Sequence, residues 1–180
     1  FADSCTSTSY PNCFFIHYIK MYNTYMLKNK FLSFILFFVI TFSASFIGGL
    51  VSISFKEPWY SELTKSNFNP PDWIFAPVWT TLYIMMTLAI WFFWLTNKRD
   101  MNTVYIYFIH IVFNTTWSII FFGLHQIFLA LIVLIILIVL IVVLILRFKR
   151  VNLISYYLMI PYLLWCCYAL FLNFNLLILN

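Results

Sequence analysis

Five long stretches of the chain are continuously apolar and contain no Asp, Glu, Lys or Arg: residues 31–55, 73–97, 101–124, 126–146 and 151–178. Each has the roughly 20 residues that an α-helix needs to cross a bilayer. Strands of a membrane barrel would instead alternate between apolar and polar positions over about ten residues. The pattern therefore predicts an all-α, polytopic membrane protein, a bundle of five transmembrane helices.

Composition points the same way, because 64% of the 180 residues are hydrophobic and only 8% are charged. A soluble domain carries about 25% charged residues, and one of this length could not bury so much apolar surface. The lipid bilayer is therefore the expected solvent. In lipid the backbone must close its own hydrogen bonds, as helices do.

The charged residues that give the chain its net charge of +5 lie outside the five apolar stretches, and they are divided unequally between the two sides of the membrane. With five spans, one side of the membrane receives eight of the ten basic residues, and the other side receives Lys56 and Lys65 together with three acids. This asymmetry predicts the N-terminus on the cytoplasmic side. A bacterial cell membrane and a mitochondrial outer membrane both remain open as hosts. Basic residues that follow the spans in this way do not indicate a nucleic-acid partner.

Residues 1–25 show no periodicity and are predicted to be a tail outside the fold, disordered or not native, with the membrane domain at 26–180. The four cysteines, Cys5, Cys13, Cys166 and Cys167, lack the spacing of metal ligands, so no metal site is predicted. The adjacent pair inside the last span is interpreted as small apolar filler.

The loop at 56–72 is the one long connection, and a loop of that length in a small chain is usually functional or disordered. Its aromatic residues argue against disorder. The loop contains Trp59, Tyr60, Phe68, Pro70 and Pro71 and is therefore expected to be functional. The two prolines hold the chain extended as it approaches the membrane.

The second span opens with features that predict a bend. Asp72 is expected to be the N-cap. Pro77 either kinks the helix interior or begins the regular helix after a looser turn. Trp73 then points toward the loop, as part of a binding site or as an interfacial anchor.

Aromatic and amide residues share helical faces in three spans. One face of the second span carries Phe75, Trp79, Leu82 and Met86, with Tyr83 one turn beyond Trp79. One face of the third span carries Asn114, Trp117, Ser118 and Phe121. One face of the fifth span carries Tyr162, Trp165, Ala169 and Asn173. Amides in a bilayer need partners, so they face the bundle interior. Two interpretations stay open: helix packing with an interfacial aromatic belt, or an aromatic-lined pocket for a flat apolar ligand.

Charged groups are missing from the spans, which disfavours ion pumps and carboxylate-driven exchangers. His110 is the one titratable group at membrane depth in the third span. It is expected to be either an interhelical hydrogen-bonding residue or an axial haem ligand.

Three blocks of sequence resemble the family of the translocator protein and the tryptophan-rich sensory protein, once called the peripheral benzodiazepine receptor family. The first is "WYSELTKSNFNPPDWIFAPVWTTLYIMM", the second "FNTTWSIIFFG" and the third "PYLLWCCYALFLN". Matching positions are Trp59, Tyr60, Leu63, Lys65, Pro70, Pro71, Trp73, Pro77, Val78, Trp79, Leu82, Tyr83 and Met86; then Asn114, Trp117, Ser118, Phe121, Phe122 and Gly123; then Pro161, Tyr162, Leu163, Trp165, Ala169, Leu172 and Asn173.

The resemblance implies a five-helix bundle, often a homodimer, with a pocket that opens toward the first loop. It implies porphyrin, haem or synthetic aromatic ligands rather than an obligatory cofactor, and cholesterol in animal members. Carried over by position, the pocket residues are Trp79, Tyr83, Asn114, Trp117, Trp165 and Ala169, with Trp73 on the lid. The resemblance makes the first loop the lid of this pocket, with the lid residues Trp59, Tyr60, Phe68, Pro70 and Pro71.

The chain departs from the family pattern at Ser66, Phe68, Ala76 and Thr87, where proline, tryptophan, glycine and glycine are usual. The cholesterol motif also fails, because no Lys or Arg follows Leu172. The sequence therefore favours a tetrapyrrole over a sterol.

Three functional hypotheses follow. The first is a membrane protein that binds porphyrin- or haem-type tetrapyrroles between Trp79 and Trp165, for sensing, sequestration or transport. The second is oxidative degradation of the bound porphyrin, with Trp79 and Trp165 as the candidate catalytic residues. The third is a scaffold or accessory subunit without a small ligand.

Overall fold

The computed structural model describes residues 29–96 and 98–180, and every regular element in that part of the chain is a helix. Five are long: α2 (Lys30–Phe55), α4 (Phe75–Trp94), α5 (Met101–Ser118), α6 (Ile127–Lys149) and α7 (Leu153–Leu179). Three are short: α3 (Trp59–Glu62), the 3₁₀-helix η1 (Asp72–Ile74) and the π-helix η2 (Ile119–Gly123). All five long helices are apolar enough to cross a membrane, which confirms the predicted fold class. The prediction of a tail at 1–25 lies outside the described residues.

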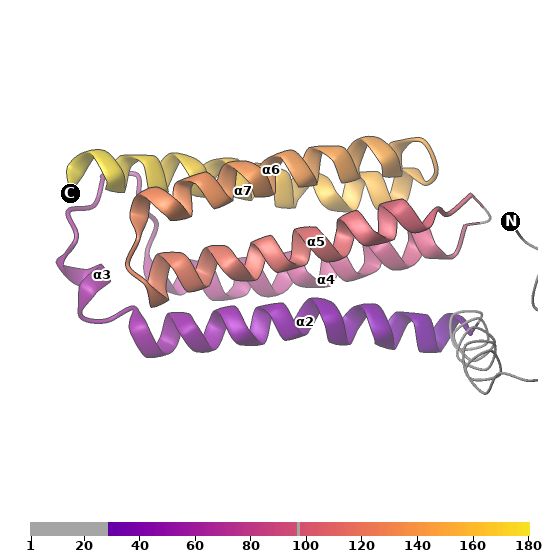
Figure 1. The fold of residues 1–180 in the computed structure, drawn as a ribbon, viewed down its shortest axis with the longest axis horizontal. Coiled ribbons are helices and arrows are strands. Elements are labelled where there is room, and N and C mark those ends of the chain that lie inside the picture. Colours follow the sequence, from indigo (N-terminus) through magenta and orange to yellow (C-terminus); the bar gives the residue numbers. More distant parts are fainter. Residues whose placement is uncertain (1–28, 97) are drawn as a thin grey trace, which may run out of the picture.

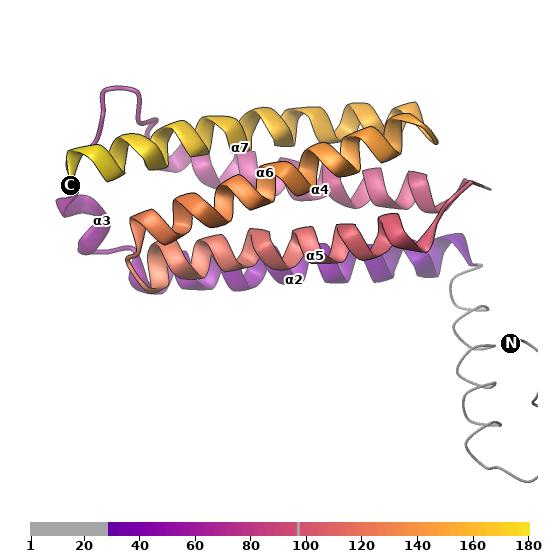
Figure 2. The same ribbon diagram turned by 45° about the horizontal axis from the view of Figure 1, so that its top comes forward.

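The long helices run side by side (Figure 1; Figure 2), and their pairwise contacts close them into a ring. α2 packs against α4 and α5, α6 packs against α5 and α7, and α4 packs against α7. The interior of the ring holds fully buried side chains, among them Met86, Phe93, Tyr107, Ile141 and Tyr162. Large apolar side chains also cover the outer surface, as expected where lipid is the solvent.

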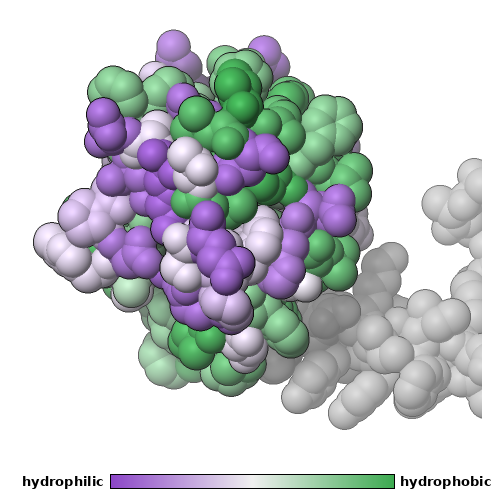
Figure 3. Space-filling view, turned by 90° about the vertical axis from the view of Figure 1, so that its left-hand side faces the viewer, coloured by the Kyte–Doolittle hydropathy of each residue, from purple (hydrophilic) through white to green (hydrophobic). Residues whose placement is uncertain are grey.

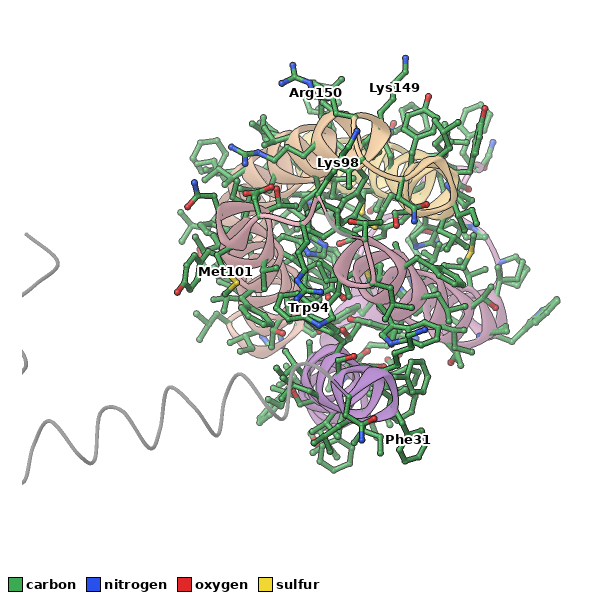
Figure 4. The ribbon with its side chains drawn as sticks, turned by 90° about the vertical axis from the view of Figure 1, so that its right-hand side faces the viewer. Phe31, Trp94, Lys98, Met101, Lys149 and Arg150 are labelled. Atoms are coloured by element: carbon green, nitrogen blue, oxygen red, sulfur yellow. The ribbon has the colours of Figure 1, made fainter. Side chains whose placement is uncertain are left out.

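The two ends of the bundle differ in charge. Lys98, Lys149 and Arg150 lie at the end where α4 joins α5 and α6 joins α7 (Figure 4). The opposite end carries the loop with α3, and hydrophilic residues gather on this face among apolar ones (Figure 3).

The second span begins differently from the prediction that Asp72 is its N-cap. Asp72 is the first residue of η1, and Ile74 occupies the N-cap position of α4 without a side-chain cap. The Asp72 carboxylate instead accepts a hydrogen bond from the Lys56 ammonium. Asp72 therefore forms an ion pair with the end of α2 and does not cap α4.

Pro77 is the third residue of α4 and does not kink a helix interior. Its missing N–H falls in the first turn, where backbone N–H groups have no intrahelical partner anyway. Of the two predicted alternatives, the looser turn followed by regular helix is the one observed.

Candidate functional site: a cavity beneath the first loop

A cavity of about 470 Å³ lies inside the ring, at the end covered by the loop between α2 and α4. Its walls come from α2, α4, α5, η2 and α7, and the loop supplies Lys56, Glu57, Tyr60 and Asn69. Residues far apart in sequence thus surround one space. Its volume is in the range of small-molecule sites, roughly 300–1,000 Å³.

Aromatic rings form two sides of the cavity. On α4, the rings of Trp79 and Tyr83 have centroids 5.7 Å apart and are inclined by 33°. Across α5 and η2, Trp117 stacks on Phe121 with centroids 5.3 Å apart and an angle of 14°. These surfaces suit a flat apolar ligand, which gains most from contact with ring faces.

Small residues of α2 form the facing wall: Ser45, Gly48, Gly49 and Ser52. A Cβ added at Gly48 would lie 3.4 Å from the Ser118 Cβ, so α2 and α5 approach closely there. The Ser118 hydroxyl donates to the Gly48 carbonyl over 3.0 Å. The sequence interpretation missed this wall, although its three- and four-residue spacing was a readable signal for one helical face.

A chain of buried hydrogen bonds leads from the cavity wall into the core. The Tyr83 hydroxyl donates to Asn114 Oδ1 (2.5 Å), and Asn114 Nδ2 donates to the Tyr162 hydroxyl oxygen (3.0 Å). Tyr162 in turn contacts His110 Nε2 at 3.1 Å. His110 Nδ1 lies 3.1 Å from the Tyr107 carbonyl, which can only accept.

That last contact sets the direction of the whole chain. His110 must carry its proton on Nδ1, so Nε2 accepts from Tyr162. Tyr162 then accepts from the Asn114 amide, and Asn114 accepts from Tyr83. Tyr83 therefore has only oxygen lone pairs left for the cavity.

Within residues 29–96 and 98–180, two side chains that line the cavity each have a buried polar atom without a protein partner: Trp117 Nε1 and Asn173 Oδ1. Asn173 is only 2% exposed, and its Nδ2 donates to the Ile127 carbonyl over 3.2 Å. An indole N–H can only donate and an amide oxygen can only accept. Both atoms are buried, so the indole N–H lacks an acceptor and the amide oxygen lacks a donor.

Charged residues surround the cavity mouth. Lys56 bonds Asp72 and lies 3.7 Å from Glu57, so the end of α2 is tied to the start of η1. Tyr60 of α3 is buried, and its hydroxyl donates to Asn69 Oδ1 over 3.3 Å. Burial raises the pKa of Tyr60, and the hydrogen bond to Asn69 offsets only part of that rise.

The loop is fastened on two sides. The Tyr168 hydroxyl of α7 donates to the Phe68 carbonyl over 2.7 Å. Trp59 stacks on His125 with ring centroids 4.4 Å apart and meets the Phe121 ring edge-on at 5.4 Å. The loop therefore covers the cavity as a packed segment, held by α7 and by the α5–α6 connection.

The sequence model of one known family matches residues 34–179, nearly the whole described part of the chain. The chain belongs to the TspO/MBR family. It is a multi-pass integral membrane protein of that family, which has members in bacteria and in mammals.

Named relatives of the TspO/MBR family align over most of their length. The Tryptophan-rich protein TspO of Chlorobaculum tepidum is 35% identical over 130 residues, which cover 68% of this chain and 79% of the relative. The Tryptophan-rich sensory protein of Cereibacter sphaeroides is 32% identical over 124 residues (69% and 78%). The Translocator protein of Ovis aries is 29% identical over 121 residues (65% and 72%).

The structure of this TspO/MBR chain brings together most of the pocket residues inferred from sequence. Trp79, Tyr83, Asn114, Trp117 and Ala169 all line the cavity. Of the lid residues, Tyr60 also lines it. Trp59, Phe68, Pro70 and Pro71 lie in the covering loop without forming part of the wall.

Two residues of the inferred ligand site, Trp73 on the expected lid and Trp165 in the expected pocket, do not line the cavity of this TspO/MBR bundle. Trp73 is 73% exposed at the loop end. Trp165 lines a separate groove between α4 and α7, beside Pro77 and Tyr168. A ligand between Trp79 and Trp165 is therefore not the arrangement that this cavity offers.

The position of Trp165 follows from helix geometry. At about 100° per residue, Trp165 points about 80° away from Asn173 and about 40° away from Ala169. The α7 residues that the sequence pattern placed on one helical face therefore point in two directions. Ala169 and Asn173 reach the cavity, whereas Trp165 points toward α4 and meets the Phe75 ring at 6.0 Å.

Proposed function

We propose that this TspO/MBR protein binds a flat tetrapyrrole, such as protoporphyrin or haem, in the cavity beneath its first loop, and that it serves in sensing, sequestration or transport. One observation carries the proposal: a cavity of about 470 Å³ with aromatic side chains on two walls and small residues on a third. Such a space accepts a wide, thin molecule and gives its faces aromatic partners.

The stacking surfaces are assigned to Trp79 and Trp117. Both indoles line the cavity, one from α4 and one from α5. Trp165 no longer has a contact role, because it lies in the groove between α4 and α7. His110 is fully buried and has both ring nitrogens hydrogen-bonded, so the proposal gives it no bond to a haem iron.

Titration of the purified protein with protoporphyrin tests the proposal, followed by the change in porphyrin absorbance. The parent should bind and Trp79→Leu should bind about tenfold more weakly, because an aromatic stacking contact contributes roughly 0.5–1.5 kcal/mol beyond area burial. Trp165→Leu is the matched control, since it removes an indole outside the cavity and should leave the affinity unchanged. Equal affinity of all three proteins, or no binding by the parent, contradicts the proposal.

A further inference from the structure

Two arginines at the basic end of the bundle are engaged within the protein. Arg147 of α6 lies 3.6 Å from the Asp100 carboxylate and donates to the Thr103 hydroxyl over 3.3 Å. Arg99 donates to the Trp94 carbonyl over 3.0 Å, and its guanidinium lies 4.5 Å from the centroid of the Trp94 ring. These two cations therefore hold the α4–α5 connection against the ends of α4 and α6.

Lys149 and Arg150, the basic pair of the α6–α7 turn, are placed differently. Lys149 ends α6 and Arg150 is its C-cap residue, and both side chains are exposed and point away from the bundle (Figure 4). The Lys149 ammonium lies 5.7 Å from the centroid of the Tyr156 ring. Among the described residues, neither cation lies within ion-pair distance of a carboxylate, and Asp100 is already paired with Arg147. The turn thus carries two adjacent positive charges without a counter-charge from this part of the chain.

Exposed apolar side chains lie next to the basic pair on both helices. On α6, Leu146 precedes the pair by three and four residues, so it shares their helical face. On α7, Leu153 and Ile154 lie in the first turn, and all three aliphatic side chains are more than half exposed. Tyr157 is exposed one turn further along, and a tyrosine is typical of the membrane–water interface. The surface is therefore cationic where the spans end and apolar directly beyond.

The position of the basic pair at the C-terminus of α6 also complements the helix dipole, but that interaction needs no partner. It leaves the N–H groups of both side chains available, five on a guanidinium and three on an ammonium. A guanidinium matches the geometry of phosphate oxygens, and an ammonium adds a point charge. Phospholipid phosphates lie at the depth where membrane spans end, so they are the anions that this turn meets.

We infer that the α6–α7 turn is a binding site for an anionic phospholipid, whose phosphate contacts the basic pair and whose acyl chains lie against Leu146, Leu153 and Ile154. Lys98 is exposed on the same half of this end, away from Phe31, and adds a third positive charge (Figure 4). A net negative headgroup is preferred, because the pair repels the cation of a zwitterionic one. The site does not involve the cavity, so it is independent of the proposed tetrapyrrole binding.

Titration of the purified protein in uncharged detergent micelles tests the site, with bound lipid measured by native mass spectrometry. Dioleoylphosphatidylglycerol is anionic and dioleoylphosphatidylcholine is zwitterionic, and both have the same chains. The parent should bind the first phosphatidylglycerol about 25-fold more tightly, about fivefold for each basic residue of the pair. Lys149→Gln and Arg150→Gln should each reduce this preference about fivefold, and the double variant should bind the two lipids with similar affinity.

Two further variants separate the turn from general effects of charge. Arg150→Lys keeps the positive charge and should retain the preference. Lys65→Gln removes one positive charge from the opposite end, where Glu57, Glu62 and Asp72 lie, and should also leave the preference unchanged. Thermal unfolding of each variant without added lipid shows whether a loss of binding comes from a loss of fold.

Glycerol 3-phosphate, which has the phosphate without the chains, distinguishes a lipid site from a site for soluble anions. It should not displace phosphatidylglycerol at matched concentration, and displacement would overturn the assignment to lipid. Equal binding of the two lipids by the parent, or an unchanged preference in the double variant, overturns the inference. A loss in Lys65→Gln as large as that in Arg150→Gln also overturns it, because binding would then follow overall charge. None of these measurements depends on protoporphyrin.

Discussion

Tyr162 is the residue on which the buried polar chain converges. It is fully buried in α7 and contacts His110 and Asn114, both of α5. Trp79 of α4 also meets its ring edge-on at 6.3 Å. One phenol therefore joins three helices of the ring, and its hydroxyl both donates and accepts within the bundle.

A double-mutant cycle tests the bond between His110 and Tyr162. His110→Leu and Tyr162→Phe should each lower the free energy of unfolding in detergent micelles, and their effects should be non-additive by about 1 kcal/mol, a typical interhelical hydrogen bond in a membrane. Thr116→Val is the control partner for Tyr162→Phe, because the Thr116 hydroxyl donates to the Val112 carbonyl of its own helix. Additive effects in the His110 pair would show that the bond contributes nothing to stability.

At the scale of elements, three of the long helices begin with a side-chain cap at the basic end: Asn29 for α2, Asp100 for α5 and Asn152 for α7. Asp100 accepts from the Thr103 N–H (2.9 Å) and hydroxyl (2.7 Å). Partial burial alone would raise the pKa of Asp100, but the Thr103 hydrogen bonds and the Arg147 charge outweigh it and lower the pKa.

The Asp100 cap predicts a pH-dependent stability. Asp100→Ala should lower the free energy of unfolding at pH 7 by about 1 kcal/mol. Because the folded pKa is lowered, the ionised cap stabilises fully above the unfolded carboxyl pKa of about 3.9 and weakens as the pH falls through the folded value. The difference between parent and variant should therefore shrink in acid.

Asn152→Ala provides the comparison for that experiment. Asn152 caps α7 through the Ile154 and Ser155 N–H groups and does not titrate. Its removal should cost a similar amount at every pH tested. A cost of Asp100→Ala that stays constant down to pH 3 would rule out the ionised carboxylate as the source of the effect.

At the scale of the whole molecule, charge separates the two ends of the ring. Within the described residues, Lys30, Lys98, Arg99, Arg147, Lys149 and Arg150 lie at one end with Asp100 as the acid. The other end has Lys56 and Lys65 with Glu57, Glu62 and Asp72. We propose that the basic end is cytoplasmic.

Cysteine labelling in intact cells tests this orientation. With the four native cysteines replaced by alanine, Asn67→Cys at the loop end should react with a membrane-impermeant thiol reagent added outside. Asn102→Cys at the basic end should react only after the membrane is opened. Both positions are exposed asparagines, so they form a matched pair. The opposite labelling pattern would reverse the assignment.

Most of the fold was predictable because long apolar runs leave few alternatives in a bilayer. The cavity was predictable where amides fixed the inward face, as at Asn114, but not where a face had to be extended by periodicity, as at Trp165. The α2 residues that line the cavity include no amide or aromatic side chain that would identify them as part of a site. Whether they line a cavity depends on which helices pack around α2. The pairing of Lys56 with Asp72 depends on the path of the loop, which no local pattern encodes.

The π-helix at Ile119–Gly123 makes the number of residues in this segment matter as much as their identity. A π-turn holds one residue more than an α-helical turn, and here the Leu124 N–H reaches back to the Ile119 carbonyl over 3.0 Å. Deleting Ile119 or Ile120 would remove this extra residue and change the angular position of Phe121 and Phe122 relative to α5. The segment should therefore tolerate substitution by apolar residues far better than a change in length.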